Sequence, residues 1–550
     1  MVFDLTCFRR LNIPSMRHFL VLLAIIFCLC AQSTLAQVQP DAGSLLIDAR
    51  QQPVMSPLQQ SDDLLLSSPS ERLSDLSIAT MVQINAVSIR GATVFSEAEL
   101  LVLLDHEVGT LYDMVGMQGL GEAITSYYQQ EGYPFAYAYL PAQSLYDGSL
   151  TIEVLEGQYG SITTSGDVEG TGAARFYFEA LQIGDVIAQE RLSRAVLVLG
   201  DVPGVTAKPV LSSGEELGTA NLEVAVSQTR GWNGIFSLDN HGNRYAGDTT
   251  ARLSLGYNHV QMFDDRLSFS LSGKSGDMTV SELGYDFALG SNGLRGGFVI
   301  SQSSYSLGKG FVGFSGSART SSVTLSYPLV RSERTNLSVT IGRKHDETND
   351  SLKGVSFEDK TSWVTSSGLS FDHRDTWFGG GQTSGTATLS EGKIISNLST
   401  SVQGRFDGKV VLDIYRQQSL SGPLSLLVHG YKQISSSPLN GSQQVSLGCA
   451  SCVRAYPPGE APANSGGYLQ TDLLYDLGIY QPFVFYDIGS THEEATNPVR
   501  TLSGYGMGLR AAQDNFQGSV SAAWKDVGGQ SQSDTLQRNP QIWAQLAYSF

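Results

Sequence analysis

Residues 541–550 read QIWAQLAYSF, and their side chains alternate between two faces of an extended chain. One face carries Ile542, Ala544, Leu546, Tyr548 and Phe550, and the other carries Trp543, Gln545, Ala547 and Ser549. A period of two residues is that of a β-strand. An apolar outer face that ends on an aromatic residue is typical of the last strand of a membrane β-barrel. The segment therefore predicts that the chain closes into such a barrel.

The same alternation extends upstream through residues 229–550. Leu253, Leu255 and Tyr257 alternate with polar residues and glycine, and about sixteen segments of this kind follow one another. Each spans about twenty residues with its turn, which suits tilted spanning strands of about ten residues. We expect an all-β membrane domain, a transmembrane β-barrel of about sixteen strands. A soluble solenoid or sandwich also alternates, but the N-terminal half of the chain favours the barrel.

Residues 1–36 have the pattern of a secretory signal peptide. Three arginines precede an apolar run at 19–30, and small residues at 34–36 offer a cleavage site. Either Met1 or Met16 serves as the start, and cleavage removes Cys7, Cys28 and Cys30. No stretch of about eighteen apolar residues follows, so any membrane span has to be a closed barrel.

Residues 37–228 precede the barrel in three parts. Residues 37–81 are rich in Gln, Ser, Asp and Pro and predict either a flexible linker or a short amphipathic helix near 42–51 with a tether. Residues 82–157 predict an α/β unit with strands at 84–89, 136–140 and 149–155 and helices at 96–104 and 118–130. Residues 158–228 repeat this order, with strands at 161–164, 205–211 and 220–226 and helices at 175–181 and 190–199.

The composition excludes one class of partner. The chain has 550 residues, a net charge of -18 and a pI near 4.8. Nucleic-acid binding leaves a basic footprint, which is missing here, so we expect no nucleic-acid partner. The acidic balance by itself indicates only a soluble, self-repelling surface.

A long connection between two alternating segments, LGCASCVRAYPPGEAPANSGG at 447–467, has the length and chemistry of a functional loop. Its pair Cys449 and Cys452 admits a redox site, a zinc site or a local disulfide, and an oxidising compartment favours the disulfide. On the strand after next, at 481–490, alternation places Phe485, Asp487 and Gly489 toward the lumen. The planar guanidinium of Arg454 suits such a carboxylate, although a surface position for this arginine stays open.

These residues carry a family resemblance. The repeated units resemble POTRA domains, and SLDNHGNRYAG at 237–247 resembles the opening of two-partner secretion barrels of the haemolysin secretion/activation family. VRAY, which is Val453, Arg454, Ala455 and Tyr456, is similar to the VRGY/F signature of their sixth long loop. FYDIG at 485–489 matches their F-x-D-x-G signature, and the start at Pro40 is similar to their N-terminal helix.

The resemblance implies a fold, a site and a function. The loop would fold back into the barrel and pair Arg454 with Asp487, although the family has Gly where this chain has Ala455. POTRA edge strands would capture a large unfolded exoprotein of adhesin or haemolysin type by β-augmentation. The lumen would pass it outward, and folding at the surface would give direction. The barrel would lie in the bacterial outer membrane in contact with lipid, with the POTRA domains in the periplasm, and barrel-assembly machinery would bind the last strand at Phe550.

Other classes of function fit less well. A barrel-assembly factor is the main alternative, but the proteins of that class that this chain resembles usually carry more POTRA repeats. A passive porin or adhesin leaves the repeated units unexplained. No H-E-x-x-H or G-x-S-x-G occurs, so we expect no enzyme, cofactor or catalytic site. The acidic run at 345–350 lacks the spacing of a calcium loop and predicts a solvated outer loop, and we expect no metal.

Overall fold

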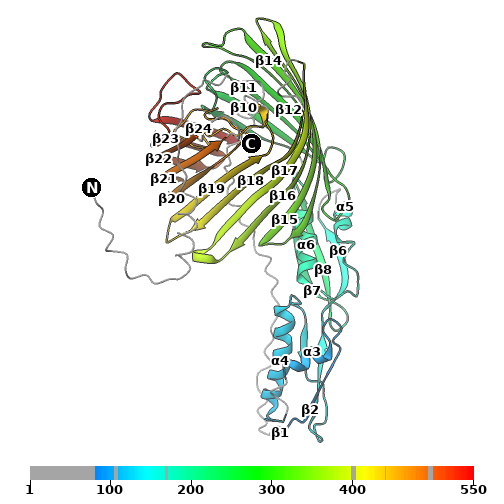
Figure 1. The fold of residues 1–550 in the computed structure, drawn as a ribbon. Coiled ribbons are helices and arrows are strands. Elements are labelled where there is room, and N and C mark those ends of the chain that lie inside the picture. Colours follow the sequence, from blue (N-terminus) through cyan, green and yellow to red (C-terminus); the bar gives the residue numbers. More distant parts are fainter. Residues whose placement is uncertain are drawn as a thin grey trace, which may run out of the picture.

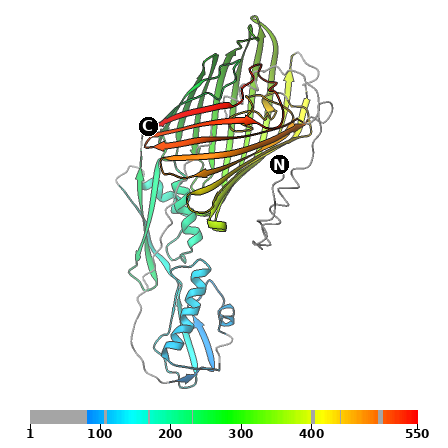
Figure 2. The ribbon, with the colours of Figure 1, turned by 90° about the vertical axis from the view of Figure 1, so that its left-hand side faces the viewer.

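A computed structural model describes residues 81–104, 109–166, 171–229, 231–397, 404–439, 441–492 and 500–550. The predicted signal peptide and the predicted amphipathic helix lie outside these residues. Figure 1 shows a β-barrel above two small α/β units, and Figure 2 shows the same order from the side. No helix of the described residues is long and apolar enough to cross a membrane.

The first α/β unit packs two helices on a three-stranded sheet. Its strand order is β2-β5-β4, and β2 runs parallel to β5. Ser96 and Glu99 form the predicted capping box at the start of α3. Helix α4 begins four residues before the predicted helix, at Met114, because the Asp113 carboxylate accepts a hydrogen bond of 2.7 Å from the Gly116 amide. The elements are β1 (Val82–Gln83), β2 (Ala86–Arg90), α3 (Glu97–Val102), β3 (Leu111–Tyr112), α4 (Met114–Gln130), β4 (Tyr137–Tyr139) and β5 (Ser149–Leu155).

The second α/β unit has the same sheet plan. Its order is β6-β8-β7, with β6 parallel to β8. The helix predicted at 175–181 is instead a short α-helix followed by a 3-10 turn, since the backbone bonds from Glu179 to Phe176 and from Leu181 to Phe178 span three residues. The elements are β6 (Gln158–Ser165), α5 (Thr171–Arg175), η2 (Phe176–Phe178), α6 (Gln189–Gly200), β7 (Val205–Ser213) and β8 (Thr219–Gln228).

A buried carboxylate ties the first unit together. Glu156, which follows β5, is only 5% exposed. It accepts hydrogen bonds from the amides of Thr93 at 2.6 Å and Val94 at 2.7 Å, from the Tyr128 hydroxyl at 2.8 Å and from the Thr93 hydroxyl. Burial by itself would raise the pKa of Glu156, but these donors favour the carboxylate and hold the pKa below its ordinary value.

Replacing Glu156 with glutamine is expected to destabilise the first unit by about 1.5–3 kcal/mol at neutral pH, because buried charge-assisted hydrogen bonds are lost. The pKa of Glu156 is lower in the folded unit than in the unfolded chain. The carboxylate therefore stabilises the unit fully at pH values above the unfolded pKa, and this stabilisation is lost as the pH falls through the folded pKa. Thermal unfolding followed by the helical circular dichroism of the full chain should show a lower melting temperature at about pH 7 and a smaller difference at about pH 3.

The control for this prediction is Glu153→Gln on β5, the strand that Glu156 follows. Glu153 accepts one hydrogen bond of 2.9 Å from the Tyr139 hydroxyl at the surface of the unit. Its replacement should change the melting temperature little at either pH. An equal loss for Glu156→Gln at both pH values would show that the charge of Glu156 does not stabilise the unit.

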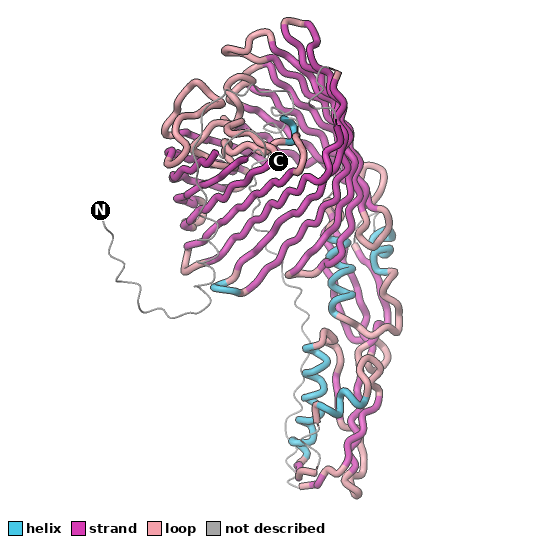
Figure 3. Tube along the Cα trace, in the orientation of Figure 1, coloured by secondary structure: helices cyan, strands magenta, loops and turns pink. Residues whose placement is uncertain are grey.

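The barrel consists of sixteen antiparallel strands in a closed order from β9 to β24. This confirms the predicted fold class. Figure 3 shows the strands running obliquely around the barrel, with most helical residues in the two units. The strands are β9 (Gly231–Asp239), β10 (Thr250–Asn258), β11 (Arg266–Lys274), β12 (Asp277–Ala288), β13 (Arg295–Ser306), β14 (Phe314–Arg331), β15 (Thr335–Leu352), β16 (Val355–Asp375), β17 (Gly381–Ser396), β18 (Gly404–Ser419), β19 (Leu424–Ser435), β20 (Ser465–Tyr475), β21 (Tyr480–His492), β22 (Arg500–Gln513), β23 (Phe516–Lys525) and β24 (Gln541–Ser549).

The last strand closes the barrel as its alternation predicts. β24 pairs with β23 on one side and with β9 on the other. Ile542 is 52% exposed on the outer face, whereas Trp543 is 3% exposed on the inner one. The side chain of Asn240 extends the β9–β24 seam, since its amide donates to the Ile542 carbonyl at 3.0 Å and accepts from the Ala544 amide at 2.8 Å.

The acidic run at 345–350 is part of a strand, so the predicted outer loop is wrong. These residues lie in β15, and the turn to β16 comes only after Leu352. His345 stacks on Trp363 of β16 with 3.8 Å between ring centroids, and Asp350 is buried and accepts a hydrogen bond of 2.5 Å from the Tyr305 hydroxyl. Cross-strand partners therefore satisfy polar side chains that looked solvated in the sequence.

The second α/β unit is fixed to one end of the barrel. Arg331 at the end of β14 binds both oxygens of Asp201, at 2.7 and 2.8 Å. Arg194 on α6 donates to the Pro328 carbonyl at 2.8 Å. The Tyr177 hydroxyl donates to Asp264, in the turn after β10, at 2.9 Å. The unit thus stands at the mouth of the lumen.

Candidate functional site

The long loop between β19 and β20 lies inside the barrel. Residues 444–464 of it, called the lumen loop below, carry the VRAY segment. Val453, Ala455 and Tyr456 are at most 1% exposed. They pack in one cluster with Phe483 and Phe485 of β21. A surface position for this segment is therefore wrong, because the inner wall of the barrel covers it.

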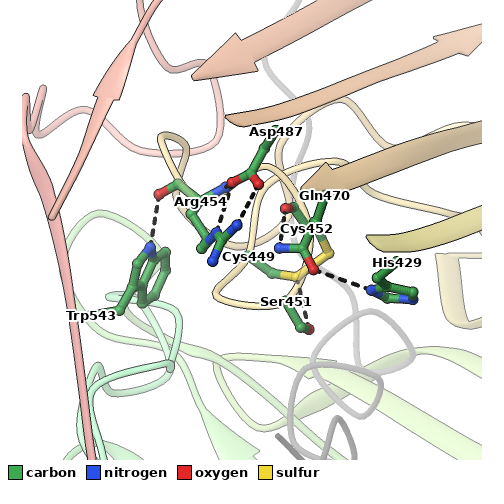
Figure 4. Close-up of a disulfide and its surroundings, with 8 residues drawn as sticks. All are labelled: His429, Cys449, Ser451, Cys452, Arg454, Gln470, Asp487 and Trp543. Carbon is green, nitrogen blue, oxygen red and sulfur yellow. Dashed lines mark hydrogen bonds and ion pairs between the residues drawn. A yellow bond between two sulfur atoms is a disulfide. The ribbon is translucent and has the colours of Figure 1, made fainter. Parts of the chain in front are cut away.

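Arg454 and Asp487 meet at the centre of the site (Figure 4). The carboxylate of Asp487 accepts from Nε of Arg454 at 2.8 Å, from Nη2 at 2.6 Å and from its backbone amide at 3.0 Å. Asp487 is 0% and Arg454 is 6% exposed. The guanidinium also lies over the Phe485 ring, 3.6 Å from its centroid. Two charges without water are stable only with such complete hydrogen bonding.

Two further charged residues join this pair and were not predicted. Asp472 on β20 accepts from Arg454 at 2.6 Å and from Arg510 on β22 at 2.7 Å. The four side chains alternate in sign, so no charge in the group lacks a partner. The two-residue period could have found Asp472, since it places residues 470 and 472 of β20 beside the inward residues 487 and 485 of β21.

Two glycines of the wall allow the lumen loop to approach. A methyl group on Gly489 would come within 2.9 Å of the Leu447 side chain, so the glycine of FYDIG leaves room for the loop. A methyl group on Gly504 of β22 would come within 2.3 Å of the Ala455 methyl. The alanine that departs from the family signature is therefore accommodated by a missing side chain on the opposite strand.

The cysteine pair forms a disulfide at the tip of the loop. Cys449 and Cys452 are joined at 2.02 Å. Gln470 donates to the Cys452 carbonyl at 2.7 Å, and its side-chain oxygen lies 3.1 Å from His429 (Figure 4). His429 in turn lies 2.9 Å from Asp413. A chain of polar contacts thus links the disulfide to the wall at β18–β20.

The other flank of the loop is held by residues that were not predicted. Trp543 donates to the Arg454 carbonyl at 2.7 Å, and the Tyr456 hydroxyl donates to the Val527 carbonyl at 2.8 Å. Glu460, which is 0% exposed, forms an ion pair with Arg500 and accepts from the amides of residues 532 and 533. Polar contacts therefore surround the loop on both flanks.

A cavity leads from the second α/β unit toward the loop. It has a volume of about 1400 Å³ and is lined by α6 and by the barrel strands. A smaller cavity of about 160 Å³ lies against the disulfide and Arg454. Both are lined by Tyr415, Leu427 and Arg510, so the space continues until the loop blocks it. Within the described ranges, no three His, Cys, Asp or Glu side chains are placed to hold a metal ion.

Two family models match the sequence. The model described as the POTRA domain, ShlB-type, matches residues 82–157. The model described as the haemolysin secretion/activation protein ShlB/FhaC/HecB matches residues 218–511, which is more than half of the chain. The first match covers the first α/β unit, and the second covers most of the barrel together with the lumen loop.

Curated proteins and solved structures agree with these matches. The heme/hemopexin transporter protein HuxB of Haemophilus influenzae is 24% identical over 485 residues, which cover 84% of this chain and 85% of HuxB. The outer membrane transporter CdiB of Escherichia coli O6:K15:H31 (strain 536 / UPEC) is 24% identical over 546 residues, which cover 94% and 92%. The structure of CdiB from Escherichia coli matches with a TM-score of 0.71 at 20% identity and covers 89% of this chain and 94% of CdiB.

Proposed function

Because the chain belongs to the haemolysin secretion/activation protein family, whose members are two-partner secretion transporters of the outer membrane, we propose that it passes a large β-helical exoprotein through its barrel. The exoprotein is of adhesin or haemolysin type. The chain is an outer-membrane barrel with its POTRA-type domain in the periplasm. Family membership favours this function over a barrel-assembly factor.

The lumen loop is the observation that carries the proposal. It blocks a cavity of about 1400 Å³ that starts at the second α/β unit, which is where a chain arriving from the periplasm would enter. Arg454 and Asp487 would act as a lock that holds the loop in the resting barrel. Val453, Ala455 and Tyr456 would pack against Phe485, and Gly489 would give them room. Export would depend on this buried pair, because the pair fixes the loop at the place where the exported chain meets it.

The two α/β units are suited to capture the exoprotein. We assign residues 82–157 and 158–228 to two POTRA domains and residues 229–550 to the barrel. In the sheet orders β2-β5-β4 and β6-β8-β7, no strand of the described residues pairs with the free side of the outer strands. An extended peptide can add to such an edge through backbone hydrogen bonds, which require little sequence specificity.

The proposal extends to two further features. The last strand, with its aromatic face of Tyr548 and Phe550, would be recognised by the barrel-assembly machinery during insertion. Export needs no catalytic step in this chain, because folding of the exoprotein at the cell surface would prevent it from sliding back.

Deleting residues 82–228 is expected to abolish export, because the exoprotein would lose its binding surface while the barrel keeps all sixteen strands. The measurement is the loss of one large protein from the culture medium. Insertion of the shortened barrel is checked by its heat-modifiable migration in gel electrophoresis. Unchanged secretion combined with impaired assembly of other barrels would instead indicate an assembly factor.

A further inference from the structure

The wall across the lumen from the lumen loop carries a cluster of small hydroxyl side chains, called the hydroxyl patch below. Thr324, Ser366 and Ser390 lie in one row across β14–β17, and Ser326, Thr340 and Thr388 lie in the next. Glycines complete both rows at positions 342 and 368. The intervening apolar residues face outward, as the exposures of 54% at Val323, 55% at Ile341 and 52% at Leu389 show. The patch therefore faces the lumen.

The residues of the hydroxyl patch carry no charge, and their six hydroxyls form no side-chain hydrogen bonds with the other described residues. Among the described residues, lumen-facing charges border the patch and are held by other side chains. Lys409 of β18, opposite Ser390, donates to Gln443 at 2.6 Å. Lys344 binds Asp346 at 2.8 Å, and Asp372 accepts from Asn336 at 3.0 Å. The patch itself thus offers hydrogen-bonding groups and carries no charge.

The position of the patch fits a path from the periplasm. The cavity that starts at Leu197 and Val198 of α6 is also lined by Ser326 and by Ser338, which continues the patch toward the periplasmic mouth. In the closed order of strands, β18–β20 separate the patch from β21, which holds the lumen loop. Figure 1 shows β14–β17 and β20–β23 on opposite sides of the barrel. A chain leaving the second unit would reach the patch before the loop.

We propose that the hydroxyl patch is the surface along which the exported chain lies in an extended form, an inference that rests on the proposed function. Side chains on one face of a strand repeat about every 6.7 Å, which is also the repeat of an extended polypeptide. A chain lying along β14 or β17 therefore meets hydroxyls at the repeat of its own peptide groups. A hydroxyl both donates and accepts, so it can replace water at either the N–H or the C=O of a peptide group. The surface fits a polypeptide rich in Gly, Ser, Thr and Asn with few charges.

Crosslinking from single cysteines in nanodiscs of phosphatidylethanolamine and phosphatidylglycerol tests the proposal. In the chain without residues 1–36, the remaining two cysteines form the disulfide and do not react with maleimides. Benzophenone maleimide is attached to Ser366→Cys, and the probe is a synthetic unfolded polypeptide of Gly, Ser, Thr and Asn. The matched positions are Leu197→Cys at the mouth, Ser519→Cys on the opposite lumen wall and Ser367→Cys on the lipid face.

Adducts are expected at Ser366→Cys and Leu197→Cys. No adduct is expected at Ser519→Cys or Ser367→Cys. In a second arm, Thr340→Lys should let a probe with Asp in place of Asn outcompete the neutral one at Ser366→Cys, because the patch then attracts acidic chains. Equal adducts at Ser366→Cys and Ser519→Cys, or none at Ser366→Cys, would overturn the proposal. The synthetic probe makes this result independent of the secretion assay, so each can fail alone.

Discussion

Arg454→Gln is expected to weaken the attachment of the lumen loop by about 3–5 kcal/mol, because removing one member of a buried ion pair leaves the other charge without compensation. Asp487 would keep no cation, since Arg510 contacts Asp472 and not Asp487. We expect loss of exoprotein secretion while the barrel still inserts, because its sixteen strands remain paired. Secretion into the medium and single-channel conductance in planar bilayers measure the two effects, and a released loop should raise the conductance.

Three companion variants separate charge from shape at this pair. Arg454→Lys keeps the charge but loses the planar fork, so it should restore only part of the function. Asp487→Asn should resemble Arg454→Gln in conductance. The double variant of Arg454→Gln and Asp487→Asn removes both charges, leaves Asp472 with Arg510, and should hold the loop better than either single change. Normal export by Arg454→Gln would contradict a lock at Arg454.

The pair of Arg454 and Asp487 could be predicted because each residue stands in a local sequence pattern. Alternation along residues 481–490 fixes which side of the strand Asp487 occupies, whatever its neighbours are. The same alternation also places Asp472 toward the lumen, but the contacts of Arg510 and Glu460 could not be predicted in this way, since their partners lie far away in the chain. The Glu460 carboxylate, for example, is satisfied by amides 72 and 73 residues away. Such partners become visible only when strand register and loop positions are known.

In the fold, too, features set by local sequence could be predicted, whereas features set by contacts between strands could not. Strand number could be predicted because each strand has its own lipid-facing apolar side, as in residues 541–550. The acidic run at 345–350 was misassigned because β15 and β16 extend as paired strands of 18 and 21 residues, beyond the length of about ten that spanning a membrane requires. Polar residues in that extension find partners on nearby strands, as Asp350 does at Tyr305 of β13, so polarity alone does not indicate a loop.

The second large effect is expected from Gly504→Ala, a change of one methyl group on the wall behind the lumen loop. The new methyl would lie 2.3 Å from the Ala455 methyl and 2.8 Å from the Trp524 carbonyl oxygen, so the loop has to move. Overpacking of this kind costs about 1–3 kcal/mol in a well-packed site. We expect most export to be lost and the conductance to rise, because the displaced segment also carries Arg454.

Ala455→Gly provides the reciprocal test, since it restores the glycine of the family signature. Alone it should cost only about 1 kcal/mol, from one lost methyl contact and a more flexible backbone. Combined with Gly504→Ala it removes the closest clash and leaves only the contact with Trp524, so the double variant should export better than Gly504→Ala alone. Strictly additive losses would mean that Ala455 and Gly504 do not touch in the working protein, and the fit of the loop against β22 would then be wrong.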